Sequence, residues 1–269
     1  MTTPAKTASL PPTDAIRPQV IDGLYPILRG MQNYHRYKVF GLENFPKRSR
    51  VVLATNHSLV TYDMVLLYFE LWRQRGRIPR SLTDHLFFKI PYLGELIEEL
   101  GSIEGTATNA KELLQRNEIV AVAPGGMKEA LRPSSERYQI IWQRRRGFVR
   151  LAVETQSPIV LACCPKADDV YDVYSSPFTR WAYKSFRVPI FFARGLGLSF
   201  FPRPVELIHY VAKPLYPPRI APGHPDFEQA VERFHERVVK RMEKLMGDAV
   251  TTRNPEDVPL HHSRRDTQD

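Results

Sequence analysis

A histidine and an aspartate lie six positions apart, directly after a short apolar run. His57 and Asp63 follow Val51-Val52-Leu53-Ala54, whose β-branched residues are typical of a buried strand. In open α/β sheets, ligands bind at the carboxyl ends of the strands, and His57 would lie at such an end. An imidazole there can take a proton from a hydroxyl group when a carboxylate fixes its tautomer. The pair is a candidate catalytic dyad, although the same spacing also suits a structural hydrogen bond at a loop.

The elements that would position this pair alternate between strand and helix patterns. Helices are predicted at residues 63–74 and 108–116, and strands at 118–123, around Ile159, around Ile190 and at 205–211. Such alternation indicates an α/β fold with a largely parallel central sheet flanked by helices. Gly125-Gly126, after the strand at 118–123, marks a tight turn or a close approach of backbone to a ligand.

Both ends of the chain have patterns of their own. Residues 1–13 are rich in Thr, Ala and Pro and are expected to be disordered. An amphipathic helix is predicted at 14–36, which suits either the surface of a membrane or packing on the sheet. The main domain would span 37–247 and end in an amphipathic helix at 226–246, followed by a loose polar tail at 248–269.

Four blocks, in this order, resemble the glycerolipid acyltransferase superfamily, typified by bacterial lysophosphatidate acyltransferases. The similarity covers roughly residues 37–217. Its blocks are Val39 to Pro46 leading into Asn56-His57 and Asp63; Phe88-Lys89-Ile90-Pro91 with Leu100 to Ile103; Ala123 to Glu129 with Arg145-Arg146-Gly147; and Ser157 to Leu161, with Val211 to Leu215 as a closing strand. The resemblance implies a glycerol-3-phosphate-acyltransferase-like fold, and an enzyme that moves a fatty acyl group from acyl-CoA or another thioester to a lipid hydroxyl.

The resemblance also implies roles for particular residues. His57 would be the general base, and Asp63 would bond its other ring nitrogen. Backbone amides of Gly125 and Gly126 would stabilise the oxyanion, with the charge of Lys128 close by. The substrate-binding set is predicted as Asn56, Lys89, Gly125, Gly126, Lys128, Glu129 and Arg145. Glu129 suits either a bond to the acceptor or a structural role in the turn, with the structural role favoured. Arg144 to Arg146 suit either coenzyme A phosphates or a solvated face.

Three departures from the majority pattern bear on the acceptor. Five residues separate His57 from Asp63 where the family usually has four, so a bulge or wider turn is needed for the side chains to meet. Gly125-Gly126-Met127-Lys128 replaces a Glu-Gly-Thr-Arg run, and residues 102–106 contain no arginine. Lysine is only a point charge for phosphate, whereas arginine binds it bidentately. The pattern resembles the neutral-lipid branch, which includes diacylglycerol acyltransferases and transmembrane-protein-68-like proteins; a lysophosphatidate or glycerol 3-phosphate acceptor is the alternative.

Composition favours an anionic partner but does not choose one. The net charge of +9 suits a membrane surface, coenzyme A or nucleic acid. Residues 173–205 lack acidic residues and combine aromatic rings with Arg180, Lys184, Arg187, Arg194 and Arg203. This is typical of a water–lipid interface. Single-stranded nucleic acid is a weaker alternative without an RNA-binding motif, and a buried aromatic core is another. No signal peptide or membrane-spanning stretch is predicted, so we expect a peripheral protein on the cytoplasmic face.

Other classes fit less well. No Gly-x-Ser-x-Gly elbow is present, which argues against a serine hydrolase. Cys163 and Cys164 are adjacent in an apolar run and suit neither a disulfide framework nor zinc. His85 and His209 show no ligand spacing, so neither a metal nor a cofactor is predicted beyond acyl-CoA as co-substrate. A non-catalytic lipid-binding protein, which would keep the basic aromatic surface without using His57, remains open, as do acyl length, donor, acceptor and oligomeric state.

Overall fold

The computed structural model describes residues 18–89, 92–142, 144–174 and 192–261. The strands are β1 Lys38–Phe40, β2 Val51–Thr55, β3 Arg80–Thr83, β4 Ile103–Glu104, β5 Ile119–Val122, β6 Ile159–Cys163, β7 Asp172–Tyr174, β8 Phe192–Arg194 and β9 Ile208–Val211. The α-helices are α1 Pro18–Tyr34, α2 Tyr62–Arg75, α3 His85–Phe88, α4 Leu93–Glu99, α5 Ala107–Gln115, α6 Gly126–Ala130, α7 Gly147–Thr155 and α9 Phe227–Thr251. Short 3-10 turns include η4 Pro165–Asp169.

The main sheet has seven strands in the order β1-β9-β6-β2-β5-β3-β4. Neighbouring strands pair in parallel except β6 and β9, which are antiparallel. The predicted α/β fold with a largely parallel sheet and flanking helices is therefore confirmed. Strands β7 and β8 form a separate antiparallel pair.

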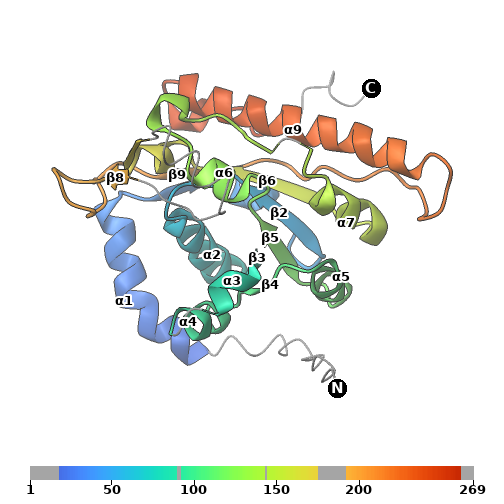
Figure 1. The fold of residues 1–269 in the computed structure, drawn as a ribbon, viewed down its shortest axis with the longest axis horizontal. Helices are drawn as coiled ribbons and strands as arrows, with labels where there is room; N and C mark the ends of the chain where they lie inside the picture. Colours follow the sequence, from blue (N-terminus) through green and yellow to red (C-terminus); the bar gives the residue numbers. More distant parts are fainter. Residues whose placement is uncertain (1–17, 90–91, 143, 175–191, 262–269) are drawn as a thin grey trace.

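Alternation along β2 explains how helices cover both faces of the sheet. Val52 and Ala54 belong to a buried cluster with residues of α5, α7 and α9, whereas Val51 and Leu53 belong to a cluster with residues of α2. Successive side chains of a strand point to opposite faces, so a strand buried on both faces is apolar throughout. In Figure 1, α5, α7 and α9 lie on one side of the sheet, and α1 to α4 lie on the other.

The N-terminal helix packs on α2 along one face. Leu28 and Gln32 are buried, Gln32 donates a hydrogen bond to Glu70 at 2.8 Å, and the ring of Tyr25 lies 5.4 Å from that of Phe69. Within the described residues the helix spans Pro18–Tyr34, so it ends two residues before the predicted 36, and residues 14–17 of the prediction lie outside the described residues. One face of this helix packs on the protein, and Tyr25 and Ile27 are exposed, so contact with a membrane surface stays an alternative for the exposed face.

Two predictions at the C-terminal end are corrected. The helix continues to Thr251, so the boundary expected at 247 lies inside α9. Residues 252–261 do not form a loose tail: Val258 is buried in the main core, and Leu260 accepts a hydrogen bond from the Lys213 amide at 3.0 Å. Apolar side chains that fit the core hold this segment. The disordered segment predicted at 1–13 and the strand predicted around Ile190 lie outside the described residues.

Candidate active site

The carboxyl ends of three parallel strands meet at one edge of the sheet. In the register of β2 with its neighbours, Ala54 pairs with Val122 of β5, and Thr55 with Ala162 of β6. The segments that follow these strands therefore lie next to each other. They are the His57 segment, the Gly125-Gly126 turn with α6, and the Cys164 segment with η4.

The imidazole of His57 is held through Nδ1. This nitrogen lies 2.9 Å from the carbonyl oxygen of Ser58 and 3.0 Å from Oγ1 of Thr61. A carbonyl oxygen can only accept, so Nδ1 carries the ring proton when the histidine is neutral. The lone pair then lies on Nε2, which is the nitrogen available to a substrate hydroxyl.

Asp63 does not bond His57, contrary to the prediction. Its Oδ1 accepts a hydrogen bond from Ser58 Oγ at 2.7 Å, and Ser58 Oγ in turn accepts from the Thr61 amide at 3.1 Å. The additional residue between the two side chains explains the difference. Thr61 takes a left-handed conformation, with φ of 62°, where α2 begins, and the resulting wider turn places Ser58 between the histidine and the carboxylate.

Burial and charge set the protonation of the pair. Burial lowers the pKa of His57, and the positive charges of Arg132 and Arg145 lower it further, although the bond to the Ser58 carbonyl raises it. The ring is therefore neutral at pH 7 and able to accept a proton. Burial raises the pKa of Asp63 to about 6, against the lowering effect of the hydrogen bond from Ser58.

Glu129 has a structural role at the Gly125-Gly126 turn. Its side chain is 0% exposed, and its Oε1 accepts from the His57 amide at 3.5 Å and pairs with Arg132 at 3.2 Å. A Cβ at Gly125 would lie 1.5 Å from Glu129 Oε2, so only glycine fits there. Burial raises the pKa of Glu129 to about 7, against the lowering charge of Arg132.

A buried ion network behind this turn was not predicted from the sequence. Arg132 donates to both carboxylate oxygens of Asp168 in η4 and to the carbonyl of Gln139 at 2.9 Å. Asp168 also accepts from the Tyr138 amide at 2.8 Å. Arg132 thus joins α6 to η4 and supports the Glu129 carboxylate that contacts His57. The local signal was only an arginine three residues after Glu129.

The predicted oxyanion and cation groups are only partly brought together. The Gly126 amide already donates to the Ala123 carbonyl at 3.0 Å. Arg145 covers this turn, because its Nη1 donates to the Pro124 carbonyl at 3.0 Å and would lie 2.4 Å from a Cβ at Gly126. Lys128, next to the buried Glu129, is exposed.

The remaining members of the predicted set lie elsewhere or have another role. Asn56 is buried, and its amide bridges to the backbone of Cys164, accepting from the Cys164 amide at 2.9 Å and donating to its carbonyl at 3.4 Å. It therefore ties β2 to β6 and does not face a substrate. Lys89 is exposed after α3. Arg146 pairs with Glu232 of α9, so the run of three arginines does not act as one cationic group.

Three potential metal ligands lie together beneath the site. Atoms of Asp63, Cys164 and His209 are all within 4.8 Å of one another, and the three side chains are buried. His209 comes from β9, whose antiparallel pairing with β6 brings it to this edge. The set offers three ligands, one fewer than structural zinc sites usually have.

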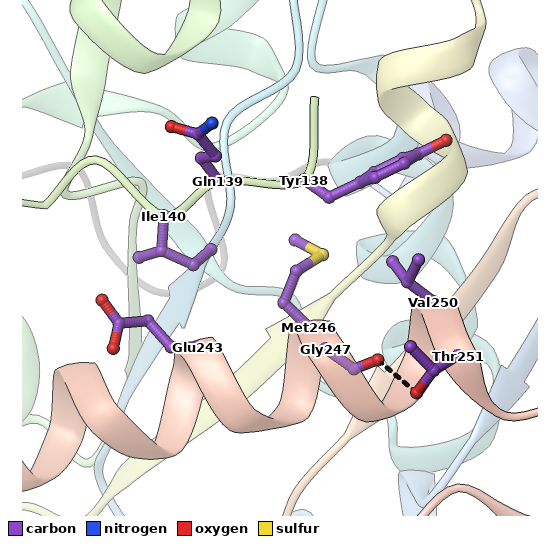
Figure 2. Close-up of a pocket in the computed structure, with 8 residues that line it drawn as sticks. All are labelled: Tyr138, Gln139, Ile140, Glu243, Met246, Gly247, Val250 and Thr251. Carbon is purple, nitrogen blue, oxygen red and sulfur yellow. Dashed lines mark hydrogen bonds between the residues drawn. The ribbon is translucent and has the colours of Figure 1, made fainter. Parts of the chain in front are cut away.

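Grooves along α9 lie apart from these residues. One groove of about 410 Å³ is bounded by Tyr138 to Ile140 on one side and by Glu243, Met246 and Val250 of α9 on the other (Figure 2). A second, of about 530 Å³, is lined by Arg144, Arg146, Glu232, His235, Glu236, Val239 and Lys240. Neither groove is lined by His57 or Asp63, so neither is the candidate active site.

Comparisons with known proteins show which families this chain resembles. Residues 36–164 match the family model described as Acyltransferase, a range that contains His57, Asp63 and Glu129. The protein described as "DGAT1/2-independent enzyme synthesizing storage lipids" is 31% identical in Bos taurus over 76% of this chain, and 31% identical in Homo sapiens over 70%. The chain spans 61% of the length of the cattle protein and 56% of that of the human protein.

Two further similarities are weaker. "Diacylglycerol O-acyltransferase 1" of Saccharomyces cerevisiae is 28% identical over 62% of this chain and 43% of its own length. The crystal structure of the 1-acyl-sn-glycerophosphate acyltransferase PlsC from Thermotoga maritima covers 84% of each chain, with 16% identity and a TM-score of 0.44. The family match spans the strand ends that form the candidate site, and over residues 36–164 this chain is similar to acyltransferases.

Proposed function

We propose that this protein is a membrane-associated O-acyltransferase that moves a fatty acyl group from acyl-CoA to a lipid hydroxyl. The observation that carries this proposal is the state of His57. It lies beyond the carboxyl end of β2 in a segment similar to acyltransferases, with its ring proton on Nδ1 and the lone pair of Nε2 available. A neutral imidazole in this orientation is suited to act as a general base.

The reaction then needs one proton acceptor and one group that stabilises negative charge. Nε2 takes the proton of the acceptor hydroxyl as that oxygen attacks the thioester carbonyl carbon. The tetrahedral intermediate collapses by breaking the carbon–sulfur bond, and the imidazolium returns its proton to the departing thiolate. Ser58 O accepts from Nδ1–H throughout, and the carboxylate of Asp63, bonded to Ser58 Oγ, adds negative charge near the imidazolium.

Arg145 is the group best supported for the oxyanion. Its guanidinium lies over the Gly125-Gly126 turn, and its charge is felt by His57, whose pKa it lowers. A fixed positive charge beside the reacting carbonyl stabilises the oxyanion more than the neutral thioester. Lys128 and Lys89 are exposed, and the contacts of the described residues place neither against His57.

For the acceptor, we propose a neutral lipid such as diacylglycerol, monoacylglycerol or a long-chain alcohol. Bidentate phosphate recognition needs a guanidinium that is free to form two parallel hydrogen bonds. Arg132 is taken up by Asp168 and Glu129, whereas Arg145 remains exposed beside the turn. The names of the cattle and human relatives, which refer to storage lipids, support the same choice. A lysophosphatidate or glycerol 3-phosphate acceptor is the alternative, with Arg145 as its phosphate ligand.

An acceptor panel tests this proposal. With one labelled acyl-CoA, we expect diacylglycerol to be used at least as well as lysophosphatidate or glycerol 3-phosphate, because the site lacks a paired arginine clamp. Initial rates of ester formation, measured by mass spectrometry, give the comparison. A tenfold or greater preference for a phosphate-bearing acceptor, lost in Arg145→Met, would replace the neutral acceptor with the alternative.

An apolar cavity of about 160 Å³ gives part of an acyl chain a place to bind. It lies between α1, α2 and the segment around α4, and its lining is Leu24, Leu28, Val65, Tyr68, Phe69, Trp72, Ile78, Ser81, Ile97, Glu99, Leu100 and Ser102. Four of the lining residues belong to α2, which begins directly after the His57 segment, so the same helix contributes to the cavity and adjoins the candidate site. Burial of methylene groups there would contribute about 0.8 kcal/mol each.

The membrane surface that we propose is the loop after β8. Leu196, Leu198, Phe200 and Phe201 are all exposed there, Leu198 by 93%. The loop is closed by its own backbone bonds, among them Gly195 N–H to Ser199 O at 2.7 Å. Phe201 contacts Tyr34, the last residue of α1, so the loop lies beside the end of that helix. No helix in the described residues has the length and apolar character needed to span a bilayer.

Basic side chains support the same surface. Asp172 in β7 pairs with Arg137, Arg194 and Arg203, which leaves an excess of positive charge at the base of the loop. Such a surface suits an anionic bilayer on the cytoplasmic side. Arg180, Lys184 and Arg187, predicted to take part, lie outside the described residues.

Charge placed at the tip of the loop is expected to weaken membrane binding. We expect Leu198→Asp to reduce co-sedimentation with anionic liposomes about tenfold, because burying a leucine side chain in lipid contributes roughly 1.5–3 kcal/mol. Tyr92→Asp is the matched control, since Tyr92 is 86% exposed and lies between α3 and α4, away from β8 in Figure 1. Equal binding of the two variants would move the membrane contact away from this loop.

A further inference from the structure

His209 faces the second carboxylate oxygen of Asp63. It lies on β9, 146 positions after Asp63, and its side chain is 0% exposed. Nε2 of His209 is 3.7 Å from Oδ2 of Asp63, and in the described part of the chain neither atom has a hydrogen-bond partner. The other ring nitrogen, Nδ1, lies 2.9 Å from the hydroxyl of Tyr37.

The proton on this ring can be assigned from its neighbours. Burial lowers the pKa of His209 to about 3, so the ring is neutral and carries one proton. Burial raises the pKa of Tyr37 well above its usual value, so the phenol keeps its proton. If Tyr37 donates to Nδ1, the ring proton lies on Nε2 and faces the carboxylate. The opposite tautomer would set two lone pairs against each other at 3.7 Å, which is unfavourable.

We infer that His209 is a positioning residue, which donates its Nε2 proton to Asp63 and keeps that carboxylate ionised and directed at Ser58. The inference rests on the proposed function of the site. A series of contacts then runs from Tyr37 through His209 of β9, Asp63 and Ser58 to His57, the proposed base. The present 3.7 Å must shorten by roughly 0.7 Å to reach an ordinary N–H···O distance.

The groups around Asp63 determine whether its carboxyl group is ionised. Burial is the main cause of its raised pKa, and the negative charge of Asp168 raises it further. The titratable neighbours around the pair are Cys164, Tyr37, Tyr62, Tyr68 and Asp168. These are acids or groups that stay neutral at pH 7, so hydrogen-bond donors favour the ionised form: the Ser58 hydroxyl and the backbone amides of Asp63 and Met64. The neutral His209 ring would add one more donor, at the carboxylate oxygen Oδ2 that has no hydrogen-bond partner in the described part of the chain.

Removing the donor is expected to raise the pKa of Asp63. A hydrogen bond to the ionised form lowers the pKa of a carboxyl group, so His209→Phe should raise the pKa of Asp63 to about one pH unit above that of the wild type. The acid limb of the kcat/KM profile should move upwards by the same amount, so transfer at a given pH on that limb should fall about tenfold. His209→Gln, whose amide can donate, should restore both.

Infrared titration of the carboxyl band in the full chain, with Asp63→Asn subtracted, measures the pKa of Asp63 without any need for activity. His235→Phe is the matched control, because His235 is also buried but lies on α9, and it should leave the titration unchanged. An Asp63 titration unaltered in His209→Phe would overturn the inference. If no acyl transfer is detected in the wild type, the proposed function fails, while the titration still decides the role of His209.

Two measurements on the unsubstituted protein apply if His209→Phe does not fold. Nitrogen-15 shifts of the His209 ring should show the proton on Nε2 and a lone pair on Nδ1; the reverse assignment would contradict the inference. Elemental analysis should find no stoichiometric zinc. Zinc removed by a chelator and lost in Cys164→Ser would instead make Asp63, Cys164 and His209 a metal site, and would overturn the proton-donor role.

Discussion

His57→Ala is expected to lower the rate of acyl transfer by about 100- to 10,000-fold, the range that general bases contribute. The reason is that Nε2 of this imidazole is the proposed proton acceptor for the attacking hydroxyl. The fold should be retained, because His57 is only partly buried and its ring contacts are confined to Ser58 and Thr61. Initial rates with a labelled acyl-CoA and saturating acceptor give the measurement.

His85→Ala is the matched control for this variant. His85 begins α3, its side chain is 54% exposed, and it contacts only Asp84 among the ion pairs of the described residues. We expect its transfer rate to stay within twofold of wild type. A His57→Ala protein that keeps its rate within a few fold would contradict the assignment of the general base, even if the protein is an acyltransferase.

Arg132→Ala is expected to cost about 3–5 kcal/mol in the free energy of unfolding, because it leaves two buried carboxylates without their cation. Asp168 would lose three hydrogen bonds from the guanidinium group of Arg132, and Glu129 would lose its ion pair with the same group. Typical domains are stable by only about 5–15 kcal/mol, so this loss is a large fraction of the total. Urea unfolding of the full chain measures it.

The control is Arg116→Ala, which removes a partly exposed pair with Glu112. Exposed pairs contribute about 0–1 kcal/mol, so the midpoint should change little. Similar unfolding free energies for the two variants would mean that the network of Arg132, Asp168 and Glu129 does not stabilise the turn beside His57.

The parts of the site that sequence reasoning reached are local. The run Val51 to Ala54 is apolar at every position because β2 is buried on both faces, and this alone placed His57 after a strand end. The acidic residue at the start of α2 and the glycine pair after β5 are also signals within one element and its flanking turn. Order along the chain was therefore enough to predict which segments approach the site.

The parts that were missed depend on geometry between distant segments. The bond from Asp63 to Ser58 follows from the left-handed conformation of Thr61, which no residue pattern signals for a threonine. The approach of His209 depends on the antiparallel pairing of β9 with β6, whereas the alternating pattern suggested a parallel neighbour. Asn56 looked like a substrate ligand because it precedes His57, yet its side-chain amide bonds to the backbone of Cys164, directly after β6.

The central claim, that this chain transfers an acyl group with His57 as base, is tested most directly by following the label from donor to product. The purified 269-residue chain is incubated with isotope-labelled acyl-CoA and diacylglycerol in vesicles, beside its His57→Ala variant. We predict a labelled ester and an equal amount of free coenzyme A from the wild type, and neither above background from the variant. Lipid binding by both proteins without labelled ester from either would contradict the account and indicate a non-catalytic lipid-binding protein.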